Sequence, residues 1–383
     1  MRIVVASSSF PAHPNEAVNA GVFVWAVVEE LAAQGHRVWV LTPAKGEPIH
    51  GFSVPVETFG WGGTQKVLTR LDPTAPRDLY HLGRLMLQGR RALKDLTRQV
   101  GAESVLTMWA VPSGFWATGG QLPFVVWALG SDIWGIGRYP LGKQILRTVL
   151  RSADHIFADG YNLVDEIESV FGRTAEFLAS ARKLPVHSTQ AASLSPRRPH
   201  FLFIGRWDTA KGPDVLLEAM VHVRSRLPEA RLHMFGGGAM EGLLRQRAAE
   251  PDLRDAVTIY GYADPTTATA YLKACDALVI PSRIESIPVI FSDALASGCP
   301  VVSTAVGDMA RVMREHPVGL LSPPEAPEAL ADAMLAIAAG PDPPRVRYGK
   351  ALEGAARSFD PARSARRCSE VLEAISSRTG KAR

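Results

Sequence analysis

The sequence has few cysteines and lacks any run long enough to span a membrane. Among its 383 residues only 3 are cysteine, at Cys275, Cys299 and Cys368, and they match neither a disulfide framework nor a zinc-ligand spacing. A membrane helix needs roughly 20 apolar residues, and the best candidate, residues 21–33, is interrupted by Glu29 and Glu30. The apolar run at the N-terminus is too short for a signal peptide. These absences predict a cytoplasmic protein.

Motifs for nucleotides and metals are also missing or incomplete. No G-x-G-x-x-G follows the first apolar run, which argues against a dehydrogenase. The segment GRYPLGKQ (137–144) has the spacing of a phosphate-binding loop, but Gln144 stands where a serine or threonine would hold magnesium. No two aspartates are separated by a single residue, and the histidines show no ligand spacing. The sequence therefore predicts a protein without a metal ion.

The composition is that of an ordinary globular protein. Hydrophobic residues make up 46% and charged residues 21% of the chain, which excludes a disordered protein. The net charge of +4 is too small to indicate a dedicated nucleic-acid binder. The length exceeds the size at which single cores stop growing, so we expect two domains.

Segments typical of strands and helices alternate along both halves of the chain. In the first half, strands are predicted over 2–7, 36–43, 103–109, 124–130 and 155–160, with a helix over 19–35. In the second half, strands are predicted over 200–205, 230–238, 257–262, 277–282 and 300–304. Short loops between alternating strands and helices produce parallel sheets covered by helices. We therefore expect an α/β protein in which two Rossmann-like domains face a cleft.

The alternation fails between the two halves, which sets the predicted boundaries. Residues 179–199 are rich in serine, proline and arginine and have no apolar period. We predict a first domain over 1–180, a linker over 181–198 and a second domain over 199–360. A last helix over 361–383 could pack back on the first domain.

One loop of the second half combines cations with glycine next to a predicted helix start. Gly205 and Arg206 end a strand, and Lys211 comes just before Pro213 in the first turn of the helix. The helix dipole and its free N–H groups favour an anion there. Two solvated loop cations are the alternative. Gly236 and Gly237 could approach the same ligand or could form a plain tight turn.

Two acids flank an otherwise apolar segment further along. Glu285 and Asp293 lie eight residues apart in PSRIESIPVIFSDALASGCPVVS (281–303). Taken alone, the pair could simply be two acids near a helix start, where the helix dipole favours negative charge.

Several segments together resemble the retaining GT-B glycosyltransferases of family 4. They are GRWDTAKGPDVLLEA (205–219), FGGG (235–238), the continuous stretch 257–308 and VGLLSPPEAPEALADAM (318–334). A weaker similarity runs through residues 19–43, MWAVPSG (108–114) and LPFVVWALGSDI (122–133).

The resemblance implies roles for particular residues. Members carry an E-x7-E motif, and Glu285 with Asp293 matches it as E-x7-D. Glu285 would face hydroxyls of the donor sugar, and Asp293 would contact the ribose of the nucleotide. Arg206 and Lys211 would stabilise the departing phosphate, so they are assigned as catalytic together with Glu285. The other donor-binding candidates are Gly21, Gly205, Gly236, Gly237, Tyr262, Ser286, Ile287, Pro288 and Val289.

The acceptor site is less defined by the sequence. Asn19, Trp109, Ser131 and Asp132 are candidates from the first domain, and Met108 and Leu129 stand where relatives often have histidine. Basic residues Lys143, Arg147 and Arg151 recur at every fourth position, so they form one face of a helix. That face could bind an anionic membrane surface carrying a lipid-linked acceptor. A solvated helix face is the alternative.

We therefore expect a cytoplasmic, retaining glycosyltransferase that needs no metal or cofactor. It would move a hexose-type sugar from a UDP- or GDP-sugar to a glycan or lipid-linked acceptor, as in polysaccharide biosynthesis, with no nucleic-acid partner. One alternative is another enzyme on the same architecture, such as an inverting transferase or a nucleotide-sugar epimerase. The other alternative is a nucleotide-sugar-binding partner subunit without turnover.

Overall fold

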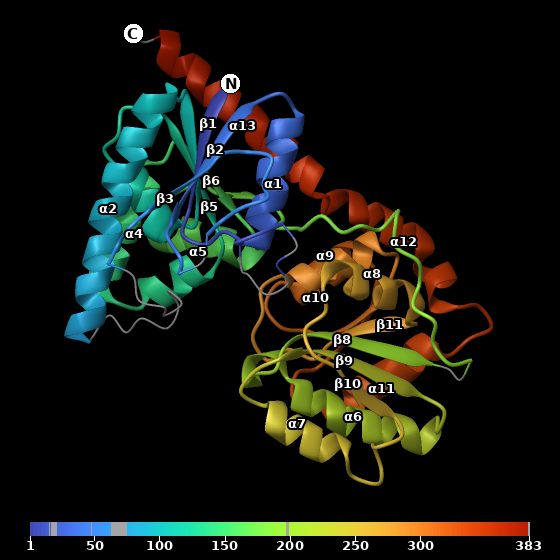
Figure 1. Ribbon diagram of the computed structural model, residues 1–383. Coiled ribbons are helices and arrows are strands. Elements are labelled where there is room, and N and C mark those ends of the chain that lie inside the picture. The colour runs from blue at the N-terminus through green and yellow to red at the C-terminus, as the bar shows by residue number, and fades with distance from the viewer. Residues whose placement is uncertain (15, 17–20, 47, 63–74, 197–198, 382–383) are drawn as a thin grey trace. The chain divides into compact units, whose positions relative to one another are not determined.

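The computed structural model describes residues 1–383 except 15, 17–20, 47, 63–74, 197–198 and 382–383. The chain divides into two compact units, one made of Met1–Ser180 with Pro361–Arg383 and the other of Ala181–Asp360. Each unit is built on one parallel sheet (Figure 1). The predicted pair of Rossmann-like α/β domains is confirmed.

The first unit contains a seven-stranded parallel sheet in the order β3-β2-β1-β4-β5-β6-β7. Its strands are β1 (Arg2–Ser7), β2 (Arg37–Pro43), β3 (Val56–Phe59), β4 (Ser104–Met108), β5 (Phe124–Ala128), β6 (His155–Ala158) and β7 (Glu176–Phe177). Central strands β1, β4 and β5 are almost wholly buried because helices cover both faces of a parallel sheet.

Alternate residues of β1 point to two separate cores in this unit. Ile3 and Val5 face the core of α1 (Val22–Ala33) and α13 (Pro361–Lys381). Val4 and Ala6 face the opposite core because successive side chains of a strand alternate between faces. The helices of that opposite core are α2 (Pro76–Val100), α3 (Phe115–Ala117), α4 (Pro140–Ser152) and α5 (Tyr161–Phe171).

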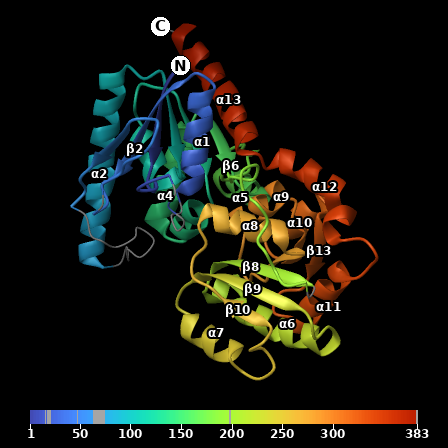
Figure 2. The ribbon, with the colours of Figure 1, turned by 45° about the vertical axis from the view of Figure 1, so that its right-hand side comes forward.

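The C-terminal helix α13 is part of the first unit. Its buried residues Cys368 and Leu372 lie in the same core as α1, and Figure 2 shows α13 running beside α1. Ser364 Oγ donates a hydrogen bond of 2.9 Å to the carbonyl oxygen of Ala179. The helix therefore closes the face of the sheet that α1 leaves partly open.

The second unit contains a six-stranded parallel sheet in the order β10-β9-β8-β11-β12-β13. Its strands are β8 (His200–Arg206), β9 (Arg231–Gly237), β10 (Val257–Ile259), β11 (Ala277–Ile280), β12 (Val301–Thr304) and β13 (Gly319–Ser322). Its helices are α6 (Pro213–Arg226), α7 (Glu241–Ala248), α8 (Pro265–Ala274), α9 (Val289–Ala296), α10 (Met309–Glu315), α11 (Pro327–Ala338) and α12 (Pro344–Ser358). The strand order reverses between β8 and β11, and ligands of such sheets bind outside the carboxyl ends of the strands at that point.

None of the helices in the described part of the chain is both long and apolar enough to cross a membrane.

We predict that α13 contributes strongly to the stability of the first unit. Leu372 is fully buried, so Leu372→Ala should lower the free energy of unfolding by about 2–5 kcal/mol through lost burial and a cavity. Urea unfolding followed by tryptophan fluorescence measures this, since seven of the 8 tryptophans lie in this unit. The exposed Arg366 on the same helix gives the control, and Arg366→Ala should change stability by less than about 0.5 kcal/mol. Equal effects of both variants would contradict the assigned packing.

Candidate functional site

The loops that follow β8 and β11 are locked together at the carboxyl edge of the second sheet. Gly212 has φ +64°, and a Cβ atom there would lie 2.1 Å from the carbonyl oxygen of Pro281. The carbonyl oxygen of Ala210 accepts hydrogen bonds from the backbone N–H groups of Arg283 (2.8 Å) and Ile284 (3.2 Å). Only glycine permits this approach, because any side chain would collide with the backbone of the opposite loop.

Arg283 adds a side-chain clamp to the same junction. Its guanidinium donates two hydrogen bonds to the carboxylate of Asp214, at 2.9 and 2.8 Å, and one of 2.9 Å to the carbonyl oxygen of Thr209. These bonds hold the pKa of Asp214 below its ordinary value. Arg283 thereby ties the loop after β11 to the start of α6.

The locked loops bring Lys211 and Glu285 into direct contact. Lys211 Nζ donates a short hydrogen bond to Glu285 Oε2 across 74 residues of sequence. The two side chains are only 22% and 13% exposed, which strengthens their attraction relative to a solvated pair. The cation and the acid that were both assigned as catalytic thus form one charged pair at the reversal point of the sheet.

Arg206 lies at the end of β8 and extends into solvent. Its side chain is 69% exposed, and Nη2 lies 3.4 Å from Asp208 Oδ2. Exposed ion pairs of this length are weak, so Arg206 can leave Asp208 for a more highly charged anion. The Asp208 side chain also accepts a hydrogen bond of 3.1 Å from the backbone N–H of Lys211.

Three of the predicted donor glycines, Gly205, Gly236 and Gly237, lie at the ends of β8 and β9, and Tyr262 contacts Gly237 from the segment after β10. Gly205 pairs with Gly236 across the two strands, and a Cβ atom on Gly236 would lie 1.9 Å from the carbonyl oxygen of Gly205. The hydroxyl of Tyr262 donates a hydrogen bond of 3.1 Å to the carbonyl oxygen of Gly237. Tyr262 is 51% exposed. Its ring therefore lies next to the backbone of Gly237 and remains partly open to solvent.

The segment from Ser286 to Val289 is held from behind by the loop after β12. Ser286 Oγ donates a hydrogen bond of 2.9 Å to Oδ2 of Asp308. Gly307 has φ +53°, and a Cβ atom there would lie 1.8 Å from the carbonyl oxygen of Glu285. Pro288 has no amide hydrogen, so the N–H groups before α9 are those of Ser286, Ile287 and Val289.

Asp293 lies one turn into α9, and its side chain is fully buried. Arg182 donates to its Oδ2 from Nε at 2.8 Å, and Nη2 lies 2.5 Å from the same oxygen. Burial raises the pKa of Asp293, and the charge of Arg182 opposes that rise. Arg182 was not among the predicted residues, because nothing in the serine- and arginine-rich segment around it marks one cation above the others.

In the first unit, Asp132 connects the segments that follow β4 and β5. Its Oδ1 accepts a hydrogen bond of 3.1 Å from the backbone N–H of Leu129, and its Oδ2 accepts one from the backbone N–H of Ala110. Burial raises the pKa of Asp132 to about 6. Trp109, beside Ala110, has φ 70° and ψ 133°, which costs a non-glycine residue of order 1–3 kcal/mol. Asp132 helps to hold that strained backbone.

The remaining candidates of the first unit have simpler surroundings. Ser131 is exposed. Gly21 precedes α1 and approaches the loop after β1, where a Cβ atom would lie 2.4 Å from the carbonyl oxygen of Ser9. Asn19 lies outside the described residues. In the segment 137–144, helix α4 begins at Pro140, so the glycine–lysine motif is helical and does not form a phosphate-binding loop.

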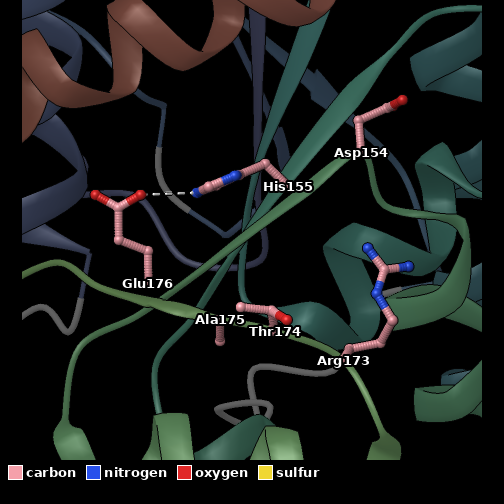
Figure 3. Close-up of a pocket in the computed structure, with 6 residues that line it drawn as sticks. All are labelled: Asp154, His155, Arg173, Thr174, Ala175 and Glu176. Carbon is pink, nitrogen blue, oxygen red and sulfur yellow. Dashed lines mark ion pairs between the residues drawn. The ribbon is translucent and has the colours of Figure 1, made fainter.

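A pocket of about 320 Å³ lies at the start of β6 and β7 in the first unit (Figure 3). It is lined by Asp154, His155, Arg173, Thr174, Ala175 and Glu176. His155 Nε2 faces Glu176 Oε2 at 3.2 Å, and Arg367 of α13 binds both oxygens of Glu176, at 2.7 and 3.0 Å. Glu176 therefore ties this pocket to α13.

Most of the second unit is similar in sequence to known proteins. Residues 188–353 match the family model described as glycosyl transferases group 1. A D-inositol 3-phosphate glycosyltransferase of Xylanimonas cellulosilytica is 32% identical over 165 residues, which cover 42% of this chain and 39% of the relative. Its counterpart from Corynebacterium glutamicum is 31% identical over 175 residues, covering 44% and 42%. The match thus spans less than half the length of these relatives.

Solved structures resemble the whole chain. Anabaena HepE in complex with UDP superimposes with a TM-score of 0.71 at 15% identity, covering 98% of this chain and 100% of that one. Sucrose-phosphate synthase from Thermosynechococcus elongatus gives 0.66 at 20% identity, covering 99% and 97%. The two Rossmann-like units therefore define a GT-B fold. Residues 188–353 match the model of the glycosyl transferases group 1 family, which confirms the resemblance seen in the sequence.

We predict a pH effect on stability that depends on Asp132. Folding raises its pKa from 3.8 to about 6, so between about pH 4 and 6 the folded chain binds more protons than the unfolded chain. The free energy of unfolding should therefore fall as pH rises through this window. The Asp132→Asn variant lacks this contribution, so the difference in unfolding free energy between wild type and variant should shift by roughly 3 kcal/mol.

Urea unfolding of both proteins at a series of pH values, followed by tryptophan fluorescence, measures that shift. Other titrating groups act equally on the two proteins and cancel in the difference. A difference that stays constant from pH 3.5 to 7 would contradict the prediction.

Proposed function

We propose that the chain is a retaining, metal-independent glycosyltransferase that uses a nucleotide diphosphate sugar as donor. The observation that carries this proposal is the Lys211–Glu285 pair, which lies at the reversal point of the sheet within the group 1 segment. The second unit would bind the donor, and the first unit would bind a glycan or lipid-linked acceptor. A hexose-type sugar would be transferred between them.

The charges at the junction suit a departing diphosphate. Breaking the sugar–phosphate bond develops negative charge on the leaving oxygen and positive charge on the sugar ring. Arg206 ends β8 and Lys211 lies in the short segment that follows it, and both would bind the developing anion. The metal-independent form of the proposal rests on the lack of an Asp-x-Asp pair in the sequence. Removing one such electrostatic contact typically lowers the rate by about 10²–10³.

The contact between Lys211 and Glu285 gives the free site a preorganised form. On donor binding, Lys211 would turn to the diphosphate and Glu285 would accept hydrogen bonds from hydroxyls of the sugar. Before the donor binds, Lys211 and Glu285 neutralise each other's charge. Both side chains are partly buried, and an unpaired charge there would be costly in free energy. The resemblance to the family supports attack by the acceptor on the leaving-group face, with the departing phosphate taking the acceptor proton.

The comparisons support UDP as the first nucleotide to test, because the HepE structure contains UDP. GDP remains the second choice. The relatives named D-inositol 3-phosphate glycosyltransferases favour a transferase over an epimerase or a partner subunit without turnover. Trp109, Ser131 and Asp132 stay candidates for the acceptor side, with Asp132 acting through the backbone that it holds.

We predict that two substitutions at the charged pair affect different steps, one the binding of the nucleotide and the other the transfer of the sugar. Lys211→Ala should weaken binding of the matching nucleoside diphosphate by about 1.5–3 kcal/mol, since it removes a charge-assisted contact. Glu285→Gln should leave binding of the bare nucleotide nearly unchanged, because its partner is the sugar, while transfer falls by about 10²–10³. Calorimetric titration of UDP, GDP and ADP with a chelator present, and a transfer assay, measure both.

The exposed Lys350 supplies a matched control, and Lys350→Ala should bind as wild type does. Equal loss of nucleotide binding in both site variants would mean that Glu285 does not face the sugar. Donor binding without transfer to a broad acceptor panel would favour the partner subunit. Hydrolysis or epimerisation without acceptor would favour a different enzyme.

We also propose that the chain acts in the cytoplasm, with the first unit touching the inner face of the membrane. Lys143, Arg147 and Arg151 share one face of α4, and Leu141 at its start is 71% exposed. Helix α2, which covers the same core (Figure 1), exposes Leu79, Tyr80 and Leu87 by 53%, 61% and 60%. Exposed apolar side chains near basic ones suit an anionic lipid surface.

Replacing all three basic residues of α4 by glutamate should release the chain from anionic vesicles. Each basic residue near such a surface contributes about 1 kcal/mol, so vesicle affinity should fall by at least about 10². Cosedimentation with phosphatidylglycerol vesicles measures this, with phosphatidylcholine vesicles for comparison. The triple variant Lys350→Glu, Arg357→Glu and Arg366→Glu changes charge equally on exposed positions of α12 and α13. If both triple variants lose binding equally, α4 is not the contact surface.

A further inference from the structure

In the ion pair of Arg182 with Asp293, only the arginine is accessible to solvent. Asp293 has a fully buried side chain, whereas Arg182 is 14% exposed. Both Nε and Nη2 of Arg182 approach the same oxygen, Oδ2. The other oxygen, Oδ1, is buried and has no hydrogen-bond partner among the described residues. The guanidinium is therefore the part of this pair that a ligand can reach.

The guanidinium has donors left for such a ligand. Arginine carries five N–H groups, and only those on Nε and Nη2 are directed at Asp293. Within the described part of the chain, Nη1 makes no hydrogen bond to protein. A largely buried guanidinium keeps its charge and orientation only while its carboxylate partner stays in place. Asp293 thus fixes a cation that is 14% exposed and has N–H groups left to donate.

Asp293 lies on the helix that begins shortly after the Lys211–Glu285 contact. Lys211 and Glu285 meet just before α9 begins at Val289. Asp293 follows four residues later on the same helix face, about 6 Å further along the axis. A donor whose diphosphate lies at Lys211 places its ribose as the next group along the molecule. The shorter aspartate, where the E-x7-E pattern has glutamate, leaves room for a guanidinium at this place.

We propose that Arg182 binds the ribose of the donor nucleotide, donating to a hydroxyl oxygen from an N–H group that Asp293 does not use, and that Asp293 is a positioning residue that holds the guanidinium. This inference rests on the proposed function and changes its assignment of Asp293. The ribose meets a cation in this chain, and the acid acts only through that cation.

Calorimetric titration of the full chain with UDP and with 2′,3′-dideoxy-UDP tests the proposal, with GDP and its dideoxy form if GDP binds more tightly. Wild type should prefer the ribonucleotide by about 10–100-fold, the value of a hydrogen bond to a charged group. Arg182→Met should bind the ribonucleotide as weakly as the dideoxy form and leave the dideoxy affinity unchanged. A merely structural role would weaken both ligands equally.

A double variant separates the two members of the pair. Arg182→Met leaves a buried carboxylate without its partner and could unfold the unit, whereas Arg182→Met with Asp293→Leu replaces the pair by apolar side chains of similar volume, an exchange that proteins tolerate. The double variant should bind each nucleotide with the same affinity as Arg182→Met does, because Asp293 acts only through Arg182. A ribose preference that survives in either variant, or a further loss on adding Asp293→Leu, would overturn the proposal.

Arg247 provides the matched control within the same unit. It is 20% exposed and pairs with the carboxylates of Glu218 and Asp252, which are 49% and 41% exposed. Arg247→Met therefore removes ion pairs nearer the surface of the same unit and should bind both nucleotides as wild type does. Wild type that binds UDP and dideoxy-UDP equally would overturn this inference alone. Wild type that binds none of UDP, GDP and ADP would overturn the proposed function and this inference with it.

Discussion

The close approach of Gly212 to the backbone of Pro281 is the constraint on which the candidate site depends. Strands β8 and β11 are neighbours in the sheet, but their loops can interlock only where one of them lacks a side chain. The two hydrogen bonds to the Ala210 carbonyl oxygen and the clamp of Arg283 then fix the junction. Without this contact, Lys211 and Glu285 would lie on independent loops, and their pairing would cost conformational entropy.

Other glycines at the same edge of the sheet also allow two backbone segments to approach closely. Gly236 brings the end of β9 against Gly205, and Gly307 brings the loop after β12 against Glu285. Each approach brings two backbone segments together without a side chain between them, and backbone N–H groups at a strand-to-helix junction favour phosphate groups. The second unit therefore combines a rigid backbone cradle with the charged pair of Lys211 and Glu285.

In the first unit, a carboxylate connects two loops. Asp132 binds backbone N–H groups from the segments after β4 and β5, and so it holds Trp109 in a backbone conformation that a tryptophan would otherwise avoid. Its burial makes the ionised form less favourable. The two units thus share one principle, in which a buried or half-buried charge joins two loops at the carboxyl ends of neighbouring strands.

The sequence by itself determined the class of fold, because apolar strands and helices alternate with short loops. Its resemblance to a glycosyltransferase family made Arg206, Lys211 and Glu285 candidate donor residues. It did not indicate the short strands β3 and β7, whose residues are half exposed and show no apolar run. The tertiary structure alone decided that Lys211 meets Glu285 and that Arg182 covers Asp293, 111 residues away. Local spacing predicts neighbours along one element, whereas contacts between distant segments arise only when the sheet brings their loops together.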